Sequence, residues 1–288
     1  MINVADTNYA FNEEIEQLMK YIFLFFTLAL FATTAFATEQ KEKAEKIFRI
    51  GVSDQNHYPL FDFTNADDMG LAHKILSLFA ERNGFTFEYK PMNYVKLQDA
   101  IEKGDIDFIF PDNPKWRTYR YTREHNIYSL PFMQGVSSTF VSNENSDITI
   151  DQVKSVAIPY GYSSLTWYAA LEKYGIDTIT TSGLDASMQY LYRGTVMAAD
   201  IEYNVANHLA ELMPNLGTIV VNKNLPSTPA RYHLSTIKHI LVIERFSHFA
   251  SKNQEQIEQL RHQYGIKTYE EVFGSDGKSE FEKWLTLE

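Results

Sequence analysis

Charged and hydroxyl side chains that can hold a small polar solute occur at three places in the sequence. The guanidinium group of Arg117 can bind a carboxylate through two parallel hydrogen bonds. Glu202, with Asp200 two residues before it, can pair with an ammonium group. Ser163 and Ser164 open an expected helix, where free N–H groups and hydroxyls either bind an anion or simply cap the helix. Unless these are ordinary surface charges and caps, they predict recognition of a solute that carries both signs of charge.

Three aromatic residues and one further acid are also candidates for a binding cleft. Tyr58, Tyr94 and Trp116 can supply flat apolar walls and cation–π attraction, or can pack in the core. Asp112 ends an expected strand, and open parallel sheets bind their ligands at such strand ends. Its alternative is a role in the turn that leads into Asn113-Pro114.

Several other kinds of chemistry are excluded or unsupported. The chain has no cysteine, which excludes disulfides, thiolate metal sites and cysteine nucleophiles. Its eight histidines form no metal-binding motif, and the sequence contains no serine-hydrolase elbow, phosphate loop or dinucleotide glycine pattern. We therefore expect no metal, no cofactor and no catalytic residue. The formal net charge of −11 argues against nucleic acid as a partner.

The first 37 residues differ from the rest of the chain. Residues 21–32 form an apolar run that is too short to span a bilayer, and Ala35-Phe36-Ala37 follows as a small-x-small cleavage signal. This layout predicts a signal peptide that is cut after Ala37, with an uncleaved membrane anchor as the alternative. Residues 1–18 are acidic where a signal peptide should be positive. We expect translation to start at Met19, which makes 1–18 an upstream extension; the alternative is that residues 1–18 are a translated but dispensable extension.

The remaining chain, in a sequence of 288 residues that is 44% hydrophobic and 22% charged, can bury a core in one large domain or two lobes. Short β-branched runs predict strands, and apolar stripes at helical spacing predict helices. The first series has expected strands at 47–52, 85–89 and 106–110 and helices at 71–83 and 94–103; the second has strands at 155–158, 177–181, 194–199 and 217–221 and helices at 163–174, 185–192 and 204–212. Such alternation predicts an α/β fold with mostly parallel sheets.

Two such series fit either one doubly wound domain or two lobes. Expected strands at 136–141 and 232–236 can be a pair of crossings between two lobes. In that case the first lobe is discontinuous, with residues 47–138 and 231–288, and the second lobe is 139–230. Periodicity alone does not choose between these arrangements.

The order of these local signals resembles the bacterial extracellular solute-binding proteins of family 3, the polar amino acid type. The resemblance covers nearly all of residues 47–265, although each motif alone is weak. The segments that carry it are Phe48-Arg49-Ile50-Gly51-Val52, Tyr58-Pro59-Leu60-Phe61, Met69-Gly70-Leu71, Leu97 with Gly104-Asp105-Ile106-Asp107, Tyr128-Ser129-Leu130-Pro131-Phe132, Val156-Ala157-Ile158-Pro159-Tyr160-Gly161 and Gly194-Thr195-Val196.

This resemblance implies particular roles for some residues. Family members usually hold the ligand carboxylate with an arginine before the Phe-Ser segment, but no arginine stands at that spacing here. Arg117 is the nearest candidate, with Arg120 and Arg123 behind it. Glu202 stands at the position of the family's ammonium-binding aspartate, and Tyr94 stands where the family places a stacking aromatic.

The resemblance also implies an architecture and a function. It implies the type II periplasmic-binding-protein fold, in which two lobes, each a mostly parallel sheet flanked by helices, are joined by two crossing strands. Such a protein is a periplasmic monomer that closes on a small polar, amino-acid-like ligand and presents it to a membrane importer. A partner of a membrane signalling receptor is an alternative. A dehydratase-like enzyme on the same fold and a purely structural protein are less favoured.

Overall fold

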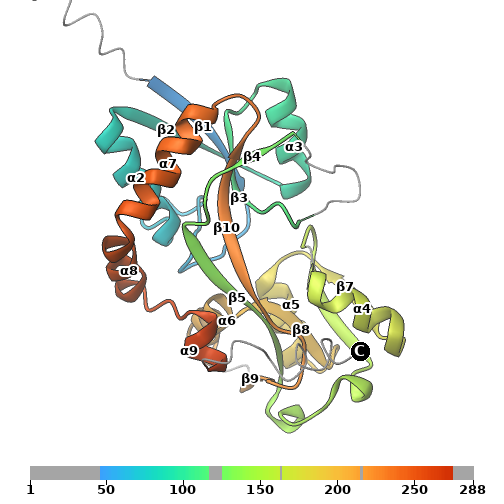
Figure 1. The fold of residues 1–288 in the computed structure, drawn as a ribbon. Coiled ribbons are helices and arrows are strands. Elements are labelled where there is room, and N and C mark those ends of the chain that lie inside the picture. The colour runs from blue at the N-terminus through green and yellow to red at the C-terminus, as the bar shows by residue number, and fades with distance from the viewer. Residues whose placement is uncertain (1–45, 117–124, 163, 215–216, 275–288) are drawn as a thin grey trace, which may run out of the picture. The chain divides into compact units, whose positions relative to one another are not determined.

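Strands and helices alternate along the chain as the sequence predicts (Figure 1). The computed structural model describes residues 46–116, 125–162, 164–214 and 217–274. The predicted signal peptide, and also Arg117, Arg120, Arg123 and Ser163, lie outside the described residues. Residues from Ile47 onward form a single unit, in which two α/β lobes are joined by two long strands.

The first lobe is built on strands β1 (Lys46–Ser53), β2 (Phe85–Met92) and β3 (Phe108–Asp112). Strand β1 runs parallel to β3, and Ile50 lies opposite Phe108. Helices α2 (Gly70–Asn83) and α3 (Tyr94–Lys103) connect these strands. Both helices end at a glycine in the left-handed conformation, Gly84 and Gly104, directly after the predicted helix ends at 83 and 103.

The second lobe contains strands β6 (Ser155–Pro159), β7 (Asp177–Thr181) and β8 (Ala198–Glu202). Strand β6 is parallel to both β7 and β8. The connecting helices are α4 (Leu165–Tyr174), α5 (Leu184–Tyr192) and α6 (Tyr203–Leu212). The short 3₁₀ helices η1 (Asn143–Asn145) and η2 (Ile150–Gln152) precede β6.

Two long strands cross between the lobes, as predicted. Strands β5 (Met133–Ser142) and β10 (Thr228–Thr236) are antiparallel neighbours, with Ala230 opposite Gly135 (Figure 1). The short strand β4 (Ile127–Tyr128) pairs with β10, and β9 (Ile219–Val221) pairs with β5.

Hydrogen bonding is continuous through both lobes, in the strand order β2-β1-β3-β10-β5-β8-β6-β7. This differs from the expectation of a separate sheet in each lobe. The reason is the length of β10: its first residues pair with β5, and its last residues pair with β3 and β4. The predicted lobe boundaries at 138/139 and 230/231 fall inside β5 and β10, and they stay predictions.

The C-terminal part consists of α7 (Ile240–Lys252), α8 (Gln254–Gln263) and the short α9 (Tyr269–Phe273). Helix α8 packs against α2 and α7 in the first lobe. The segment before α9 instead contacts the start of α6. The side chain of Asn204 accepts a hydrogen bond from the backbone N–H of Lys267 (2.7 Å) and donates one to its carbonyl (3.1 Å). The chain therefore returns to the second lobe after α8.

Strand β8 begins four residues later than predicted, at residue 198 rather than 194. Gly194 adopts a left-handed φ of 66° and starts a turn after α5, so residues 195–197 are needed to bring the chain into the sheet. Strand β3 is displaced in the same direction, beginning at 108 instead of 106. The correction matters for function, because it places Asp200 and Glu202 inside a buried strand and not in a loop.

The core of the first lobe is rich in phenylalanine. Phe79, Phe108, Phe110 and Phe246 are fully buried, and the Phe79 and Phe246 rings meet edge to face at 5.0 Å. Gly70, at the start of α2, has φ +82° and lies against the backbone of residues 59–61, where a Cβ would come within 2.8 Å of a carbonyl oxygen. This close approach anchors the loop after β1, which carries several residues of the site described next.

Candidate functional site

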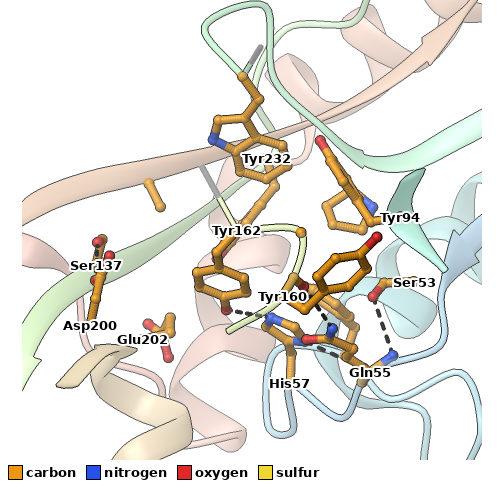
Figure 2. Close-up of a pocket in the computed structure, with 15 residues that line it drawn as sticks. Ser53, Gln55, His57, Tyr94, Ser137, Tyr160, Tyr162, Asp200, Glu202 and Tyr232 are labelled. Atoms are coloured by element: carbon orange, nitrogen blue, oxygen red, sulfur yellow. Dashed lines mark hydrogen bonds between the residues drawn. The ribbon is translucent and has the colours of Figure 1, made fainter. Parts of the chain in front are cut away.

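A cavity of about 90 Å³ lies where loops and strand ends of the two lobes meet (Figure 2). The loops after the parallel strands β1 and β6 and the last residues of β8 contribute to its wall. Ligand sites of open α/β sheets occupy this position, outside the carboxyl ends of parallel strands. The residues that line it are Ser53, Gln55, His57, Phe61, Tyr94, Pro111, Trp116, Ser137, Tyr160, Gly161, Tyr162, Asp200, Glu202, Ala230 and Tyr232.

Two acids from β8 face this cavity. Asp200 and Glu202 are two residues apart on one strand, so they project from the same side of the sheet. Their side chains are almost completely buried, with 2% and 3% of their surface exposed. Burial raises the pKa of both carboxyls, that of Glu202 to about 7. At neutral pH the carboxyl of Glu202 therefore exchanges its proton easily.

Hydrogen bonds fix the position of each carboxyl. Oδ1 of Asp200 accepts from the Ser137 hydroxyl at 3.1 Å. Glu202 is the N-cap of α6 and accepts from the backbone N–H of Val205 at 2.8 Å. Its other oxygen accepts from the backbone N–H of Val136 and from the side chain of Asn204, both at 2.8 Å. These donors oppose the effect of burial on the pKa of Glu202 without overcoming it.

A histidine–tyrosine pair joins the loop after β1 to the loop after β6. Nε2 of His57 lies 2.6 Å from the hydroxyl of Tyr162, and Nδ1 lies 3.3 Å from the carbonyl of Gln55. A carbonyl accepts hydrogen bonds, so the proton belongs on Nδ1, and the Tyr162 hydroxyl donates to Nε2. Burial lowers the pKa of His57 to about 4, and the imidazole is neutral at physiological pH. The His57 ring also stacks on Phe61 at 4.6 Å.

Aromatic rings form much of the remaining wall. Trp116 meets the rings of Tyr94 and Tyr232 edge to face, with centroids 5.8 Å and 5.9 Å away. Tyr160 and Tyr162 come from the other lobe (Figure 2). The cavity thus offers apolar ring surface next to buried acids, an arrangement that suits a small solute with a polar or positively charged group.

The structure brings four of the predicted site residues to the cavity: Tyr94, Trp116, Asp200 and Glu202. Arg117 and Ser163 lie outside the described residues, so their roles in ligand binding stay predictions. Ser164, the N-cap of α4, is buried and is not part of the cavity wall, but its hydroxyl opposes the effect of burial on the pKa of Asp200, which does line the cavity.

Tyr58 and Asp112 lie away from the cavity, in contrast to the prediction. The Tyr58 ring packs against His208 of α6 at 4.7 Å, and its hydroxyl donates to Asp68 at 3.2 Å. The loop turns at this point so that its neighbour, His57, faces inward instead. Tyr58 therefore contacts the other lobe directly and is not a wall of the site.

Asp112 is a structural residue at the end of β3. Its Oδ2 accepts from the Ser235 hydroxyl at 2.5 Å and from the Asn126 amide at 3.2 Å, and its Oδ1 accepts from the backbone N–H of Asn113. Through these hydrogen bonds the carboxylate connects β3, β10 and the segment before β4. The bond from the N–H of Asn113 corresponds to the turn role that the sequence indicates as the alternative for Asp112.

The sequence reasoning missed several residues of the wall, above all Gln55, His57, Tyr162 and Tyr232. A signal was present for one of them. Tyr162 follows Gly161, whose φ of +84° makes the turn after β6, and it directly precedes the candidates Ser163 and Ser164. The chemistry that indicates the two serines, free N–H groups and hydroxyls at a helix start, does not extend to the tyrosine beside them.

No family model matches this sequence, and no curated protein matches it either. Solved structures do match. An ancestral arginine-binding protein bound to arginine superposes with a TM-score of 0.63 at 17% identity, over 76% of this chain and 98% of that one. The GluR0 ligand-binding core in complex with L-glutamate gives 0.64 at 16% identity, over 77% and 99%. At these identities the likeness establishes the fold alone, which is the two-lobed α/β fold of the type II periplasmic binding proteins.

Two further neighbours have other roles. A histidine kinase sensor domain with similarity to periplasmic binding proteins matches with a TM-score of 0.63 at 16% identity, over 78% of this chain and 98% of that one. An ancestral amino-acid-binding protein described as a precursor of cyclohexadienyl dehydratase matches at 0.61 and 15%, over 77% and 96%. The same fold therefore serves binding, sensing and an enzyme lineage.

The described residues contain no group of three or more His, Asp or Glu side chains placed to hold a metal ion. In the same part of the chain, no helix combines the length and the apolar character needed to cross a membrane.

Proposed function

We propose that this chain is a solute-binding protein that captures a small polar, amino-acid-like ligand in the cavity and presents it to a membrane importer. The observation that carries this proposal is the shared wall, to which the first lobe contributes Gln55 and Tyr94 and the second lobe contributes Tyr160 and Asp200. A ligand that touches both lobes stabilises the closed arrangement over an open one. The partner then recognises the closed protein.

The proposal includes a periplasmic location and a monomeric state. The apolar run at 21–32 and the Ala-x-Ala sequence at 35–37 support export with cleavage after Ala37. N-terminal sequencing of exported protein should give a start near Thr38. Recovery of a protein that retains residues 21–32 would indicate a membrane anchor. Light scattering should give the mass of one chain, and nucleic acid is not a partner in this proposal.

A signalling role is the second candidate, and the likeness to a histidine kinase sensor domain supports it. Crosslinking in intact cells distinguishes import from signalling, because an importer and a receptor give different crosslinked membrane proteins.

An enzyme is less favoured, although the carboxyl of Glu202, with a pKa of about 7, has the proton affinity of an acid–base catalyst. We expect solute recovered after incubation to be chemically unchanged.

A thermal-shift screen of amino acids, amines, small carboxylates and short peptides tests the proposal. A solute that binds the folded protein raises the melting temperature as its concentration rises. The variant Ala230→Phe places a ring in the cavity and should abolish the shift. The matched variant Ala66→Phe, at an exposed loop position, should retain it. Equal shifts in both variants, or no shift with any solute, would contradict the proposal.

A further inference from the structure

The ionisable carboxyl groups on the described cavity wall are not matched by basic groups on that wall. Asp200 and Glu202 are buried acids, whereas the described lining residues include no lysine or arginine. The one histidine, His57, is neutral because its pKa is lowered by burial. Among the described lining residues these buried acids have no basic neighbour, and a cation that enters the site stabilises them.

The aromatic part of the wall has a matching electrostatic character. Ring faces carry partial negative charge and attract ammonium and guanidinium groups. Tyr94, Trp116 and Tyr232 form one connected set of edge-to-face rings, and Tyr160 and Tyr162 add two rings from the second lobe. A cation in the cavity therefore meets both formal and partial negative charge.

An unpaired acceptor on the wall indicates that the cation carries N–H groups. The side-chain nitrogen of Gln55 donates to the carbonyl of Tyr160 at 3.2 Å, while its side-chain oxygen is buried and has no hydrogen-bond partner. A buried acceptor without a donor is unfavourable, and an N–H group of a ligand removes that cost. The hydroxyl of Tyr162 donates its hydrogen bond to His57, so its oxygen is free to act as a second acceptor on the same wall.

The size of the cavity limits the group that fits. An engineered apolar cavity of about 150 Å³ accommodates benzene, with six heavy atoms. The cavity of this protein has a volume of about 90 Å³, and by proportion it accommodates a group of about four heavy atoms. An alkylammonium of three carbons and a guanidinium ion both have four.

We propose that the solute is a compact organic cation with N–H donors, a primary ammonium or guanidinium compound, and that its recognition requires no carboxylate. This rests on the proposed function, since it names the ligand class of the same cavity. The cationic group lies against Asp200 and Glu202 among the tyrosine and tryptophan rings, and its N–H groups supply the donors that the acceptors of the wall require.

Four matched probes test this ligand class by calorimetry at constant pH and ionic strength. n-Propylammonium chloride is the cation, 1-propanol is its neutral analogue, 2-aminobutyrate is the same ammonium with a carboxylate added, and tetramethylammonium chloride is a cation without N–H groups. For a ligand of about four heavy atoms, the dissociation constant should be no tighter than about 40 μM. We expect n-propylammonium to bind at least tenfold more tightly than 1-propanol and tetramethylammonium, and at least as tightly as 2-aminobutyrate.

Variants identify the site of this binding. At pH 8, Asp200→Asn and Glu202→Gln should each weaken n-propylammonium binding at least tenfold, because each removes a carboxyl whose ionised form pairs with the cation. Glu211→Gln, an exposed position on α6, is the matched control and should leave the affinity within twofold of wild type.

The outcomes separate this inference from the proposed function. Equal binding of 1-propanol, or at least tenfold tighter binding of 2-aminobutyrate, overturns the ligand class while a solute-binding function stands. The same holds if none of the four probes binds but the wider screen finds another solute. If neither the probes nor the screen gives binding, both proposals fail.

Discussion

Replacing Glu202 by glutamine should change how stability depends on pH. The pKa of Glu202 is raised from 4.5 to about 7 by burial, so between these values the folded protein keeps a proton that the unfolded chain has released. The free energy of unfolding of wild type therefore falls as pH rises through this window. A shift of this size corresponds to about 3 kcal/mol. Glu202→Gln cannot lose a proton and should escape this loss.

Urea unfolding followed by tryptophan fluorescence, at pH 4 to 8.5, measures the effect. Glutamine keeps one acceptor oxygen, so the variant loses the hydrogen bond from the N–H of Val136 or the one from the N–H of Val205. This loss is a constant offset, so the quantity to follow is how the difference from wild type changes with pH. That difference should shift in favour of Glu202→Gln by about 3 kcal/mol between pH 4 and pH 8. The exposed substitution Glu211→Gln should run parallel to wild type. Parallel curves for Glu202→Gln would refute the reasoning, because they would mean that the carboxyl titrates normally.

Three further substitutions give distinct outcomes in the same unfolding assay. His57→Gln should gain stability relative to wild type as pH falls from 7 to 4, by about 3 kcal/mol, because the buried imidazole has its pKa lowered from 6.5 to about 4 and resists protonation; no pH-dependent difference would contradict this. Tyr162→Phe leaves Nε2 of His57 without its donor and should cost about 1–3 kcal/mol, whereas an unchanged midpoint would show that the 2.6 Å contact contributes nothing. Asp112→Ala should cost about 2–3 kcal/mol through the loss of its three hydrogen bonds, which leaves the backbone N–H of Asn113 and the hydroxyl of Ser235 without this acceptor, while solute affinity stays within twofold; a large loss of affinity would restore a ligand role.

Much of the fold could be predicted because its signals are local. A buried strand, an apolar helical stripe and a glycine stop each occupy a few consecutive residues, as in α2 with Gly84 and α3 with Gly104. The predicted start of β8 was wrong because the turn after Gly194 contains apolar residues such as Val196, which is itself buried. Apolar character alone does not distinguish a buried turn from the strand it enters.

The site was less predictable because chain folding decides which neighbour faces inward. His57 and Tyr58 are adjacent, and the geometry of one loop sends the first to the cavity and the second against His208. The partner of His57 is Tyr162, more than one hundred residues away in the sequence, and no local spacing connects them. Glu202 was predicted because the resemblance places it at the family's ammonium-binding position, with Asp200 two residues before it. The structure keeps the two acids together because both lie on β8, where side chains two residues apart share a face.

The measurement that tests the central claim most directly is a crystal structure of the protein with the tightest solute from the screen. The account predicts that the solute lies in the interlobe cavity, that it contacts Asp200 or Glu202 from one lobe, and that it contacts Tyr94 or Trp116 from the other. A solute bound outside this cavity, or held by one lobe alone, would contradict it.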